Sequence, residues 1–341
     1  MTKGIKDKRR MTHTRPRIGF LGTGWIGRHR MAAMVASGAI EAVAISDPSP
    51  EMVAAAVQDA PGAQVCASLD EMLALGLDGV VIASPSALHA AQSIAALEAG
   101  VAVFCQKPLG RDAAENAAVV AAARRADRLL GVDLSYRHTA GMRAIAPLVR
   151  SGALGRVFAI DLTFHNAYGP DKPWFYDRAQ SGGGCVMDLG IHLADLALWL
   201  NPGAVAERVD AALYAGGART AADAVEDYAA ATVQLDNGVV VRLACSWRLH
   251  AGQDAVIEAA FYGTEGGAAL RNVGGSFYDF TAEHFRGTAR ETLAVPPDDW
   301  GGRAAVDWAE RLAAGARFDP AAEDYVATAR LLDAIYAAGR G

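Results

Sequence analysis

Three polar residues in apolar surroundings carry groups that could polarise an oxygen and move a proton. Lys107 follows the apolar run 101–105 in the stretch VAVFCQKPLG. Asp188 and His192 stand four residues apart in GGGCVMDLGIHLADLALW, a spacing that puts both side chains on one face of a helix. An imidazole exchanges protons near neutral pH, and an amine can hydrogen-bond to a developing alkoxide. Together these residues indicate chemistry at a hydroxyl or carbonyl group.

Each of these residues also has a purely structural interpretation. Lys107 could end a strand and extend into solvent along its aliphatic stem. His192 could be a core histidine satisfied by Asp195, and Asp188 could stabilise the start of the helix through the dipole. The Asp188–His192 spacing also suits a metal pair, but the sequence offers no third ligand, so we expect no metal.

A glycine-rich loop near the start of the chain predicts a dinucleotide site. In RIGFLGTGWIGRHR, a G-x-G-x-x-G lies between an expected strand and an expected helix. Such glycines allow a tight turn, close approach of a pyrophosphate and close packing of helix on strand. The residues of this loop that we expect to contact the cofactor are Gly22, Gly24, Trp25, Ile26 and Gly27.

The cofactor preference is indicated by Asp47, which ends the next strand roughly 20 residues after the last glycine. An acid at this place accepts hydrogen bonds from the ribose hydroxyls. Its carboxylate would repel a ribose phosphate, and the segment SDPSPE contains no arginine to offset that repulsion. NAD is therefore favoured over NADP, although Ser46 and Ser49 leave room for NADP.

The elements that must position these groups alternate, up to residue 137, between short apolar runs and Ala-rich helical stretches. This pattern indicates a parallel sheet covered on both faces. Ligands of such sheets gather at the carboxyl ends of the strands, where Ser84, Pro85, Gln106 and Lys107 fall. We therefore expect these four residues beside the cofactor. Beyond residue 137, alternating strands and a hairpin signal at Asn237-Gly238 predict an α+β domain.

Composition excludes several classes of partner. The chain has 341 residues, of which 52% are hydrophobic and 21% charged, enough for two cores. A formal net charge of −6 gives no attraction to nucleic acid or to an anionic membrane. The sequence shows neither an export signal nor an apolar run of membrane-spanning length. Its four cysteines lie far apart and form no CxxC or zinc-binding pattern. We therefore expect them to be reduced thiols of a cytoplasmic protein.

Four motifs in order resemble the glucose–fructose oxidoreductase and inositol dehydrogenase (Gfo/Idh/MocA) family: GFLGTGWIG, ASPSALHAAQSIAALEAG, VFCQKPLG and GGGCVMDLGIHLADLALW. The resemblance covers nearly the whole chain beyond its N-terminal tail. It implies an NAD(P)-dependent dehydrogenase or reductase that transfers a hydride to or from a carbinol carbon of a sugar, inositol or related polyol. It also implies a homodimer or homotetramer.

The sequence pattern and the resemblance together predict a division of the chain. We expect a flexible tail over residues 1–15 and a Rossmann domain with a doubly wound parallel sheet over residues 16–137. Residues 138–341 should form an α+β substrate-binding and oligomerisation domain with a large, mainly antiparallel open sheet.

The resemblance assigns roles to individual residues. Lys107 matches the lysine of the family's Glu-Lys-Pro motif, and His192 matches the usual proton-transfer group, with Asp188 beside it. His89 matches a histidine after the fourth strand and is expected at the cofactor. Gln106 is a departure, because the family usually has glutamate there, so a charge is lost beside Lys107. We interpret this change as tuning.

Substrate specificity is expected from the sheet and loops of the second domain, together with Asp188 and His192. The further candidates are Arg137, His165, Asn166, Trp174, Trp247 and Arg248. Two alternatives to a dehydrogenase stay open at this point. One is an NAD-dependent glycosidase on the same scaffold, and the other is a catalytically silent dinucleotide-binding regulator.

Overall fold

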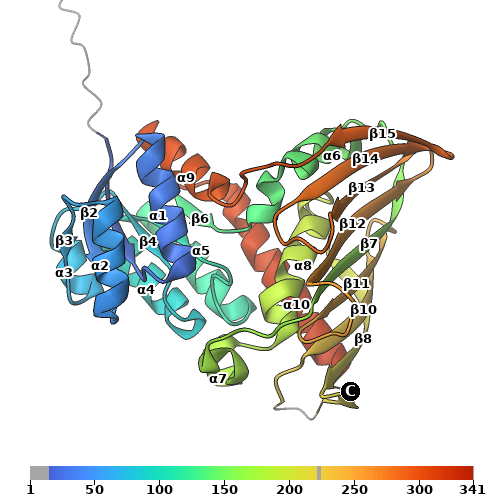
Figure 1. Cartoon of the computed structure of the whole chain (residues 1–341), viewed down its shortest axis with the longest axis horizontal. Coiled ribbons are helices and arrows are strands. Elements are labelled where there is room, and N and C mark those ends of the chain that lie inside the picture. The colour runs from blue at the N-terminus through green and yellow to red at the C-terminus, as the bar shows by residue number, and fades with distance from the viewer. Residues whose placement is uncertain (1–14, 221–223, 341) are drawn as a thin grey trace, which may run out of the picture.

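The computed structural model describes residues 15–220 and 224–340. The predicted flexible tail therefore lies, apart from its last residue, outside the described residues. Figure 1 shows two lobes, one around a smaller sheet and one along a long, curved sheet, with α8, α9 and α10 in the region between them.

The smaller sheet has six parallel strands in the order β3-β2-β1-β4-β5-β6. This is the order of a doubly wound dinucleotide-binding fold, with its switch point between β1 and β4. The strands are β1 (Arg17–Leu21), β2 (Glu41–Ser46), β3 (Gln64–Val65), β4 (Gly79–Ile82), β5 (Ala102–Cys105) and β6 (Leu130–Val132). The helices are α1 (Trp25–Ser37), α2 (Pro50–Asp59), α3 (Leu69–Leu73), α4 (Ser86–Glu98) and α5 (Ala113–Ala126).

The alternating side chains of these strands form a core on each face of the sheet. Ile18 and Phe20 of β1 pack with Met31 of α1 on one face, whereas Val80 and Ile82 of β4 belong to the core on the other. Because both faces are covered, β4, β5 and β6 are apolar and buried along their whole length, as the sequence pattern predicted.

The first lobe also receives a segment from the far end of the chain. Helix α9 (Arg303–Ala313) packs on α1 and on the β5 and β6 strands. The Trp308 ring centroid lies 5.8 Å from that of Phe104, and a Cβ at Gly131 would come within 2.7 Å of Trp308. A division of the chain at residue 137 therefore does not describe all of this lobe, because no local pattern tells which sheet a late helix joins.

The long sheet has nine strands in the order β15-β14-β13-β12-β7-β11-β10-β8-β9, and its pairs are antiparallel except for β7 with β11. The predicted hairpin at Asn237-Gly238 joins β10 to β11, and Gly238 has a φ of 84°. The strands are β7 (Val157–Asn166), β8 (Ala206–Ala215), β9 (Ala218–Arg219), β10 (Tyr228–Leu235), β11 (Val240–Ser246), β12 (Ala255–Gly263), β13 (Gly267–Asn272), β14 (Phe280–Arg286) and β15 (Ala289–Ala294).

Helices cover the face of the long sheet that is turned toward the first lobe (Figure 1). They are α6 (Ala140–Arg150), α8 (Ile191–Trp199) and α10 (Glu323–Gly339). The second lobe and its connections also contain short helical turns: α7 (Arg178–Ser181), the 3₁₀ turns η1 (Ser135–His138), η2 (Pro173–Tyr176) and η4 (Pro320–Ala322), and the π-helical turn η3 (Val186–Gly190). On the other face, charged side chains such as Arg242 and Asp161 pair across neighbouring strands. The predicted fold, a Rossmann-type domain beside a large and mainly antiparallel open sheet, is confirmed.

Within the described ranges, no helix has both the length and the apolar character that crossing a lipid bilayer would require.

Candidate active site

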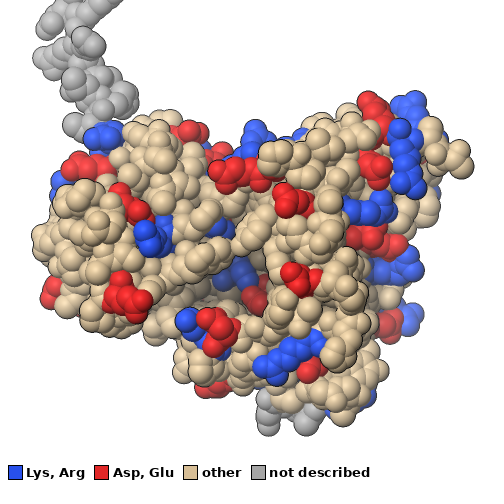
Figure 2. All heavy atoms as spheres, viewed as in Figure 1, with Lys and Arg blue, Asp and Glu red and all other residues tan. Residues whose placement is uncertain are grey.

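A cleft of about 1380 Å³ separates the carboxyl edge of the six-stranded sheet from the second lobe. Figure 2 shows this hollow between the two lobes, with charged side chains in its depth. The glycine loop and the ends of β2, β4, β5 and β6 line one side. Residues from η3, α8 and the segments 277–279 and 297–301, which flank β14 and β15, line the other. The cleft is thus large enough for an extended ligand and a second small molecule.

The three glycines of the loop have different environments. Gly22 has a φ of 85°, and a Cβ there would lie 2.5 Å from the Ala83 carbonyl oxygen. A Cβ at Gly27 would lie 2.2 Å from the Gly22 oxygen, so the first helical turn packs tightly on the loop. A Cβ at Gly24 would meet no atom within 4 Å. The middle glycine, at the start of α1, therefore leaves its backbone open to an approaching phosphate.

Asp47 lies at the end of β2 and ties the glycine loop to the next helix. Its Oδ2 accepts a hydrogen bond from the Thr23 backbone N–H at 2.7 Å, and its Oδ1 accepts one from Ser49 N–H at 2.9 Å. Asp47 lines the cleft together with Trp25 and Ile26. The carboxylate thus has a structural task, holding the loop, that the spacing in the sequence did not reveal.

His89 of α4 connects two strand ends at the cleft. Its Nε2 lies 2.7 Å from the Ser84 carbonyl oxygen, and its Nδ1 lies 2.6 Å from the Pro108 carbonyl oxygen. Burial lowers the pKa of His89, whereas the two carbonyl acceptors favour the protonated ring. His89, Ser84 and Pro85 all line the cleft, so this histidine fixes the loop after β4 against the segment that carries Lys107.

Lys107 reaches across the cleft to the second lobe. Its Nζ donates to Asp188 Oδ1 at 2.6 Å and to the Asp188 carbonyl oxygen at 2.7 Å. The other carboxylate oxygen, Oδ2, accepts a hydrogen bond from Trp247 Nε1 at 3.0 Å. Trp247 is buried and fixes the carboxylate from behind, while the lysine and Asp188 line the cleft.

The second lobe presents Asp188 and His192 from two different turns. Asp188 lies in η3 and His192 in the first turn of α8. A π-helical turn widens the spacing between side chains, and such turns are frequent at functional sites. The structure places both residues in the lining of the cleft, although the regular helix that the sequence predicted begins only after Asp188.

His192 forms no hydrogen bond with Asp195, whose carboxylate binds Arg137 instead. Its Nδ1 is buried and has no hydrogen-bond partner among the described residues, and its ring lies 4.9 Å from the ring of Tyr136. Burial is the main cause that lowers the pKa of His192 well below its ordinary 6.5, with contributions from the positive charges of Lys107 and Arg30. The imidazole is therefore neutral at neutral pH and able to accept a proton.

Three glycines let the polypeptide before η3 pass close to a buried acid. A Cβ at Gly183 would lie 1.9 Å from the Tyr336 hydroxyl oxygen, and one at Gly184 would lie 1.9 Å from the Glu226 carbonyl oxygen. Glu226 Oε1 accepts hydrogen bonds from Gly184 N–H at 3.0 Å, Val186 N–H at 2.9 Å and the Tyr336 hydroxyl at 2.9 Å. Glu226 thus anchors the start of the turn that carries Asp188.

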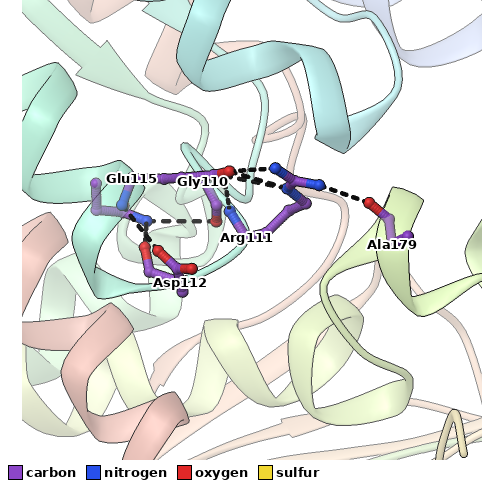
Figure 3. A network of polar contacts seen from close by, with 6 residues as sticks. Gly110, Arg111, Asp112, Glu115 and Ala179 are labelled. Atoms are coloured by element: carbon purple, nitrogen blue, oxygen red, sulfur yellow. Dashed lines mark hydrogen bonds and ion pairs between the residues drawn. The ribbon is translucent and has the colours of Figure 1, made fainter. Parts of the chain in front are cut away.

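A polar network ties the segment after Lys107 to the second lobe (Figure 3). Arg111 binds the Glu115 carboxylate and donates to the Ala179 carbonyl oxygen of α7 at 2.6 Å. Asp112 begins α5 by accepting a hydrogen bond from Glu115 N–H at 2.8 Å. These contacts link the segment between β5 and α5 to α7 of the second lobe.

Arg137 is a predicted substrate ligand that the structure does not bring into the cleft. Its guanidinium binds Asp195, with Nε donating to Oδ2 at 2.7 Å, and lies 5.6 Å from the centre of the Trp199 ring. It lines a separate hollow of about 1090 Å³. Arg137 is therefore a structural residue, held by Asp195 and packed against Trp199.

His165 and Asn166 also lie away from the cleft lining. The inward side chains of β7 are Ile160, Leu162 and Phe164, and alternation turns His165 to the opposite face. There His165 Nδ1 lies 2.8 Å from Ser246 Oγ. Asn166 Oδ1 accepts a hydrogen bond from Tyr168 N–H at 2.7 Å and closes the strand end.

Of the six further substrate candidates, Trp174 is the one that lines the cleft. Its ring stacks on Phe175, with centroids 3.8 Å apart. Arg248 instead donates to the Tyr176 hydroxyl at 3.0 Å, outside the cleft lining. Trp174 and Phe175 of η2 therefore add an aromatic surface to the lining of the cleft.

Sequence reasoning missed several polar residues of the cleft, among them Asp133, Tyr136 and Arg30. Asp133 directly follows β6 and Tyr136 lies in the next turn, η1, so the rule that ligands gather at strand ends could have found both. Arg30 lies in α1 beyond the glycine motif and meets Asp133 only through the fold, over 103 residues of sequence. No spacing signal marks such a pair.

Two family profiles match this chain. The one described as "Oxidoreductase family, NAD-binding Rossmann fold" matches residues 16–134, and the one described as "GFO/IDH/MocA C-terminal domain" matches residues 142–269. Between them they span all six strands of the first sheet and the strands of the second as far as β13.

Relatives of this chain include two that match three quarters of its length. A 1,5-anhydro-D-fructose reductase of Ensifer adhaerens is 29% identical over 261 residues, 75% of this chain and 76% of its own length. A putative UDP-kanosamine synthase oxidoreductase subunit of Amycolatopsis mediterranei is 34% identical over 275 residues, 75% of each protein. A solved levoglucosan dehydrogenase in complex with NADH has the same fold, with a TM-score of 0.81 over 96% of this chain and 97% of its own, at 22% identity.

Proposed function

Because this chain belongs to the Gfo/Idh/MocA oxidoreductase family, we propose that the cleft binds NAD and a sugar, inositol or related polyol, with Lys107, Asp188 and His192 at the reacting oxygen. The coarser activity follows from the family: the protein is an NAD(P)-binding oxidoreductase that acts on CH–OH groups. The observation that carries the proposal is that Lys107 and His192 line one cleft with the glycine loop.

The residues of the first lobe fit a dinucleotide. The open backbone at Gly24 suits a pyrophosphate at the start of α1, and Asp47 suits the ribose hydroxyls. When bound, the nicotinamide supplies or accepts the hydride. The lining near Asp47 includes Glu51 and no lysine or arginine among the described residues. A ribose phosphate would meet only negative charge there, which favours NAD over NADP.

The proton is handled by the second lobe. In oxidation, the neutral imidazole of His192 accepts the hydroxyl proton, and in reduction the ring returns it. Lys107 hydrogen-bonds to the same oxygen and stabilises its developing negative charge. Asp188 holds the lysine through the 2.6 Å contact and is itself held by Trp247, so both groups are positioned before substrate arrives.

The charges in the cleft favour an uncharged substrate. Among the described lining residues, each lysine or arginine side chain is in an ion pair, and the acidic side chains outnumber the basic ones. The pairs are Arg30–Asp133, Lys107–Asp188 and Lys172–Asp171. A phosphate or carboxylate on the substrate would have no unpaired cation to meet. We therefore expect sugars like those named for the anhydrofructose and levoglucosan enzymes, and not a nucleotide sugar.

The test is a panel of neutral polyols and aldoses, sugar phosphates and uronates, each with NAD and with NADP, followed by the absorbance of the reduced cofactor. The proposal predicts turnover with a neutral polyol and NAD, and a weak reaction with NADP that Asp47→Ser increases. Release of an aglycone without net NAD reduction would instead identify a glycosidase. Tight NAD binding without turnover of any compound would identify a regulator.

The location in the cell and the oligomeric state stay predictions. The exposed face of the nine-stranded sheet is the surface on which we expect a homodimer or homotetramer to form. Light scattering coupled to gel filtration tests this, and a monomer at micromolar concentration would contradict it.

A further inference from the structure

We propose that Asp133 and Gln106 are positioning residues that act as one unit with Arg30, holding this arginine at the reacting end of the cleft and fixing the strand end that carries Lys107. The proposal rests on the proposed function, because it takes the cleft to be the site of the reaction. It also explains why position 106 is glutamine in this chain.

The three side chains come from three elements and meet in the interior. Arg30 Nε donates to Asp133 Oδ2 at 2.6 Å, and Gln106 Nε2 donates to the same oxygen. Arg30 lies in α1, Gln106 directly follows β5, and Asp133 directly follows β6. The side chains of the ion pair are only 7% and 1% exposed. A contact of this kind ties the cofactor-binding helix to the ends of two strands.

The backbone reinforces this unit. Gln106 N–H donates to the Ile82 carbonyl oxygen at 2.8 Å, and Asp133 N–H donates to the Cys105 carbonyl oxygen at 2.9 Å. The ends of β4, β5 and β6 are therefore locked together immediately before Lys107. A shift of the Gln106 side chain would move the next residue, whose amine must reach Asp188 across the cleft.

Charge balance requires an uncharged partner at position 106. Arg30 and Asp133 neutralise each other, and the Gln106 amide adds a donor without adding charge. A glutamate there would put two carboxylates in contact in a buried place where Arg30 is the paired cation of only one of them, which is strongly unfavourable. The carboxylate that faces Arg30 thus comes from Asp133, directly after β6, and glutamine at position 106 is its necessary complement.

The Arg30–Asp133 pair also bears on the charge around His192. Lys107 after β5 and Arg30 in α1 add positive charge that favours the neutral ring. Asp188 in η3 is paired with Lys107, and the ring of Tyr136 in η1 lies 4.9 Å from the imidazole. Asp133 is paired with Arg30 and therefore offsets the charge of that arginine. Changing the charge at position 106 or 133 should therefore move the acid limb of the pH profile in opposite directions.

The test is a charge exchange between the two positions. Gln106→Glu, Asp133→Asn and the double variant Q106E/D133N are compared with wild type in kcat/KM against pH, in melting temperature and in NADH affinity by fluorescence. Each single variant should lose at least tenfold in kcat/KM. The acid limb should move to higher pH in Q106E and to lower pH in D133N, and the double variant should return to within threefold of wild type.

The matched control is Arg28→Met, on the same helix but paired with Asp59 outside the cleft lining, which should leave all three measurements unchanged. Multiplicative losses in the double variant, or single variants within twofold of wild type, would overturn the proposal. A wild type without polyol turnover would contradict the proposed function instead. In that case the recovery of melting temperature and NADH affinity in the double variant still tests whether the three side chains act together.

Discussion

Lys107 and Asp188 lie 81 residues apart in sequence, yet the Lys107 ammonium nitrogen lies 2.6 Å from the Asp188 carboxylate. The two lobes contribute one residue each, so the reacting end of the cleft exists only when the lobes are docked. The contact holds the amine where the oxygen of a substrate can also reach it.

Asp188→Asn should release Lys107 and lower kcat by about tenfold to a hundredfold, because the amide is a weaker partner for the ammonium group. The double variant K107M/D188N should be no slower than K107M alone, since the two residues act as a pair. Steady-state kinetics of the three variants checks this. Independent, multiplicative losses would show that Asp188 acts apart from Lys107.

Mutation of Trp174 and mutation of His165 should have different effects on the KM for the polyol, although the sequence predicted both residues as substrate ligands. Trp174→Ala removes an aromatic surface in the cleft and should raise the KM for the polyol at least fivefold. His165→Ala changes the opposite face of the sheet and should leave KM within twofold. The KM values of the two variants, measured with the same substrate, decide the matter. Equal effects would contradict the placement of His165.

Tyr336→Phe should destabilise the protein by about 1–3 kcal/mol, because the hydroxyl donates to the buried Glu226 carboxylate at 2.9 Å and accepts from Met187 N–H at 3.2 Å. Since Glu226 anchors η3, kcat should fall more than NADH affinity. Urea unfolding and NADH titration measure the two effects. An unchanged midpoint would show that the hydroxyl contributes nothing to this anchor.

Stability should fall as the pH drops below 6.5. Burial lowers the pKa of His192 in the folded protein, whereas the unfolded chain titrates near the ordinary value. The unfolded state therefore binds more protons below pH 6.5, and the stabilisation present above this pH is lost as the pH falls toward the folded pKa. The histidine contributes a slope of up to about 1.4 kcal/mol per pH unit. His192→Gln should reduce the slope between pH 7 and 5 in urea unfolding, and an unchanged slope would contradict this reasoning.

The sequence predicted the parts of the site that depend on local pattern. The glycine loop, Asp47 and the strand-end Lys107 follow from motifs and from the rule for parallel sheets, and the structure places all of them in the cleft. The four-residue spacing likewise brought Asp188 and His192 to the same wall, across a π-helical turn that the spacing did not reveal.

What could not be predicted depends on tertiary packing. A strand of alternating residues does not reveal which face meets the helices, so His165 was nominated while the buried neighbour Phe164 faces inward. Arg137 is an exposed-looking cation in the sequence, but the fold buries it against Asp195. Arg30 and Asp133 form a pair that only the meeting of α1 with β6 creates.

The central claim is that Lys107 and His192 act on a substrate oxygen beside NAD. The most direct test is the rate of NAD reduction by the best neutral polyol in wild type, Lys107→Met and His192→Ala, with NADH affinity measured on the same samples. The claim predicts that each variant loses about 10² to 10⁴ in kcat and keeps NADH affinity within threefold. Near-normal kcat in both variants, with NADH affinity retained, would contradict it.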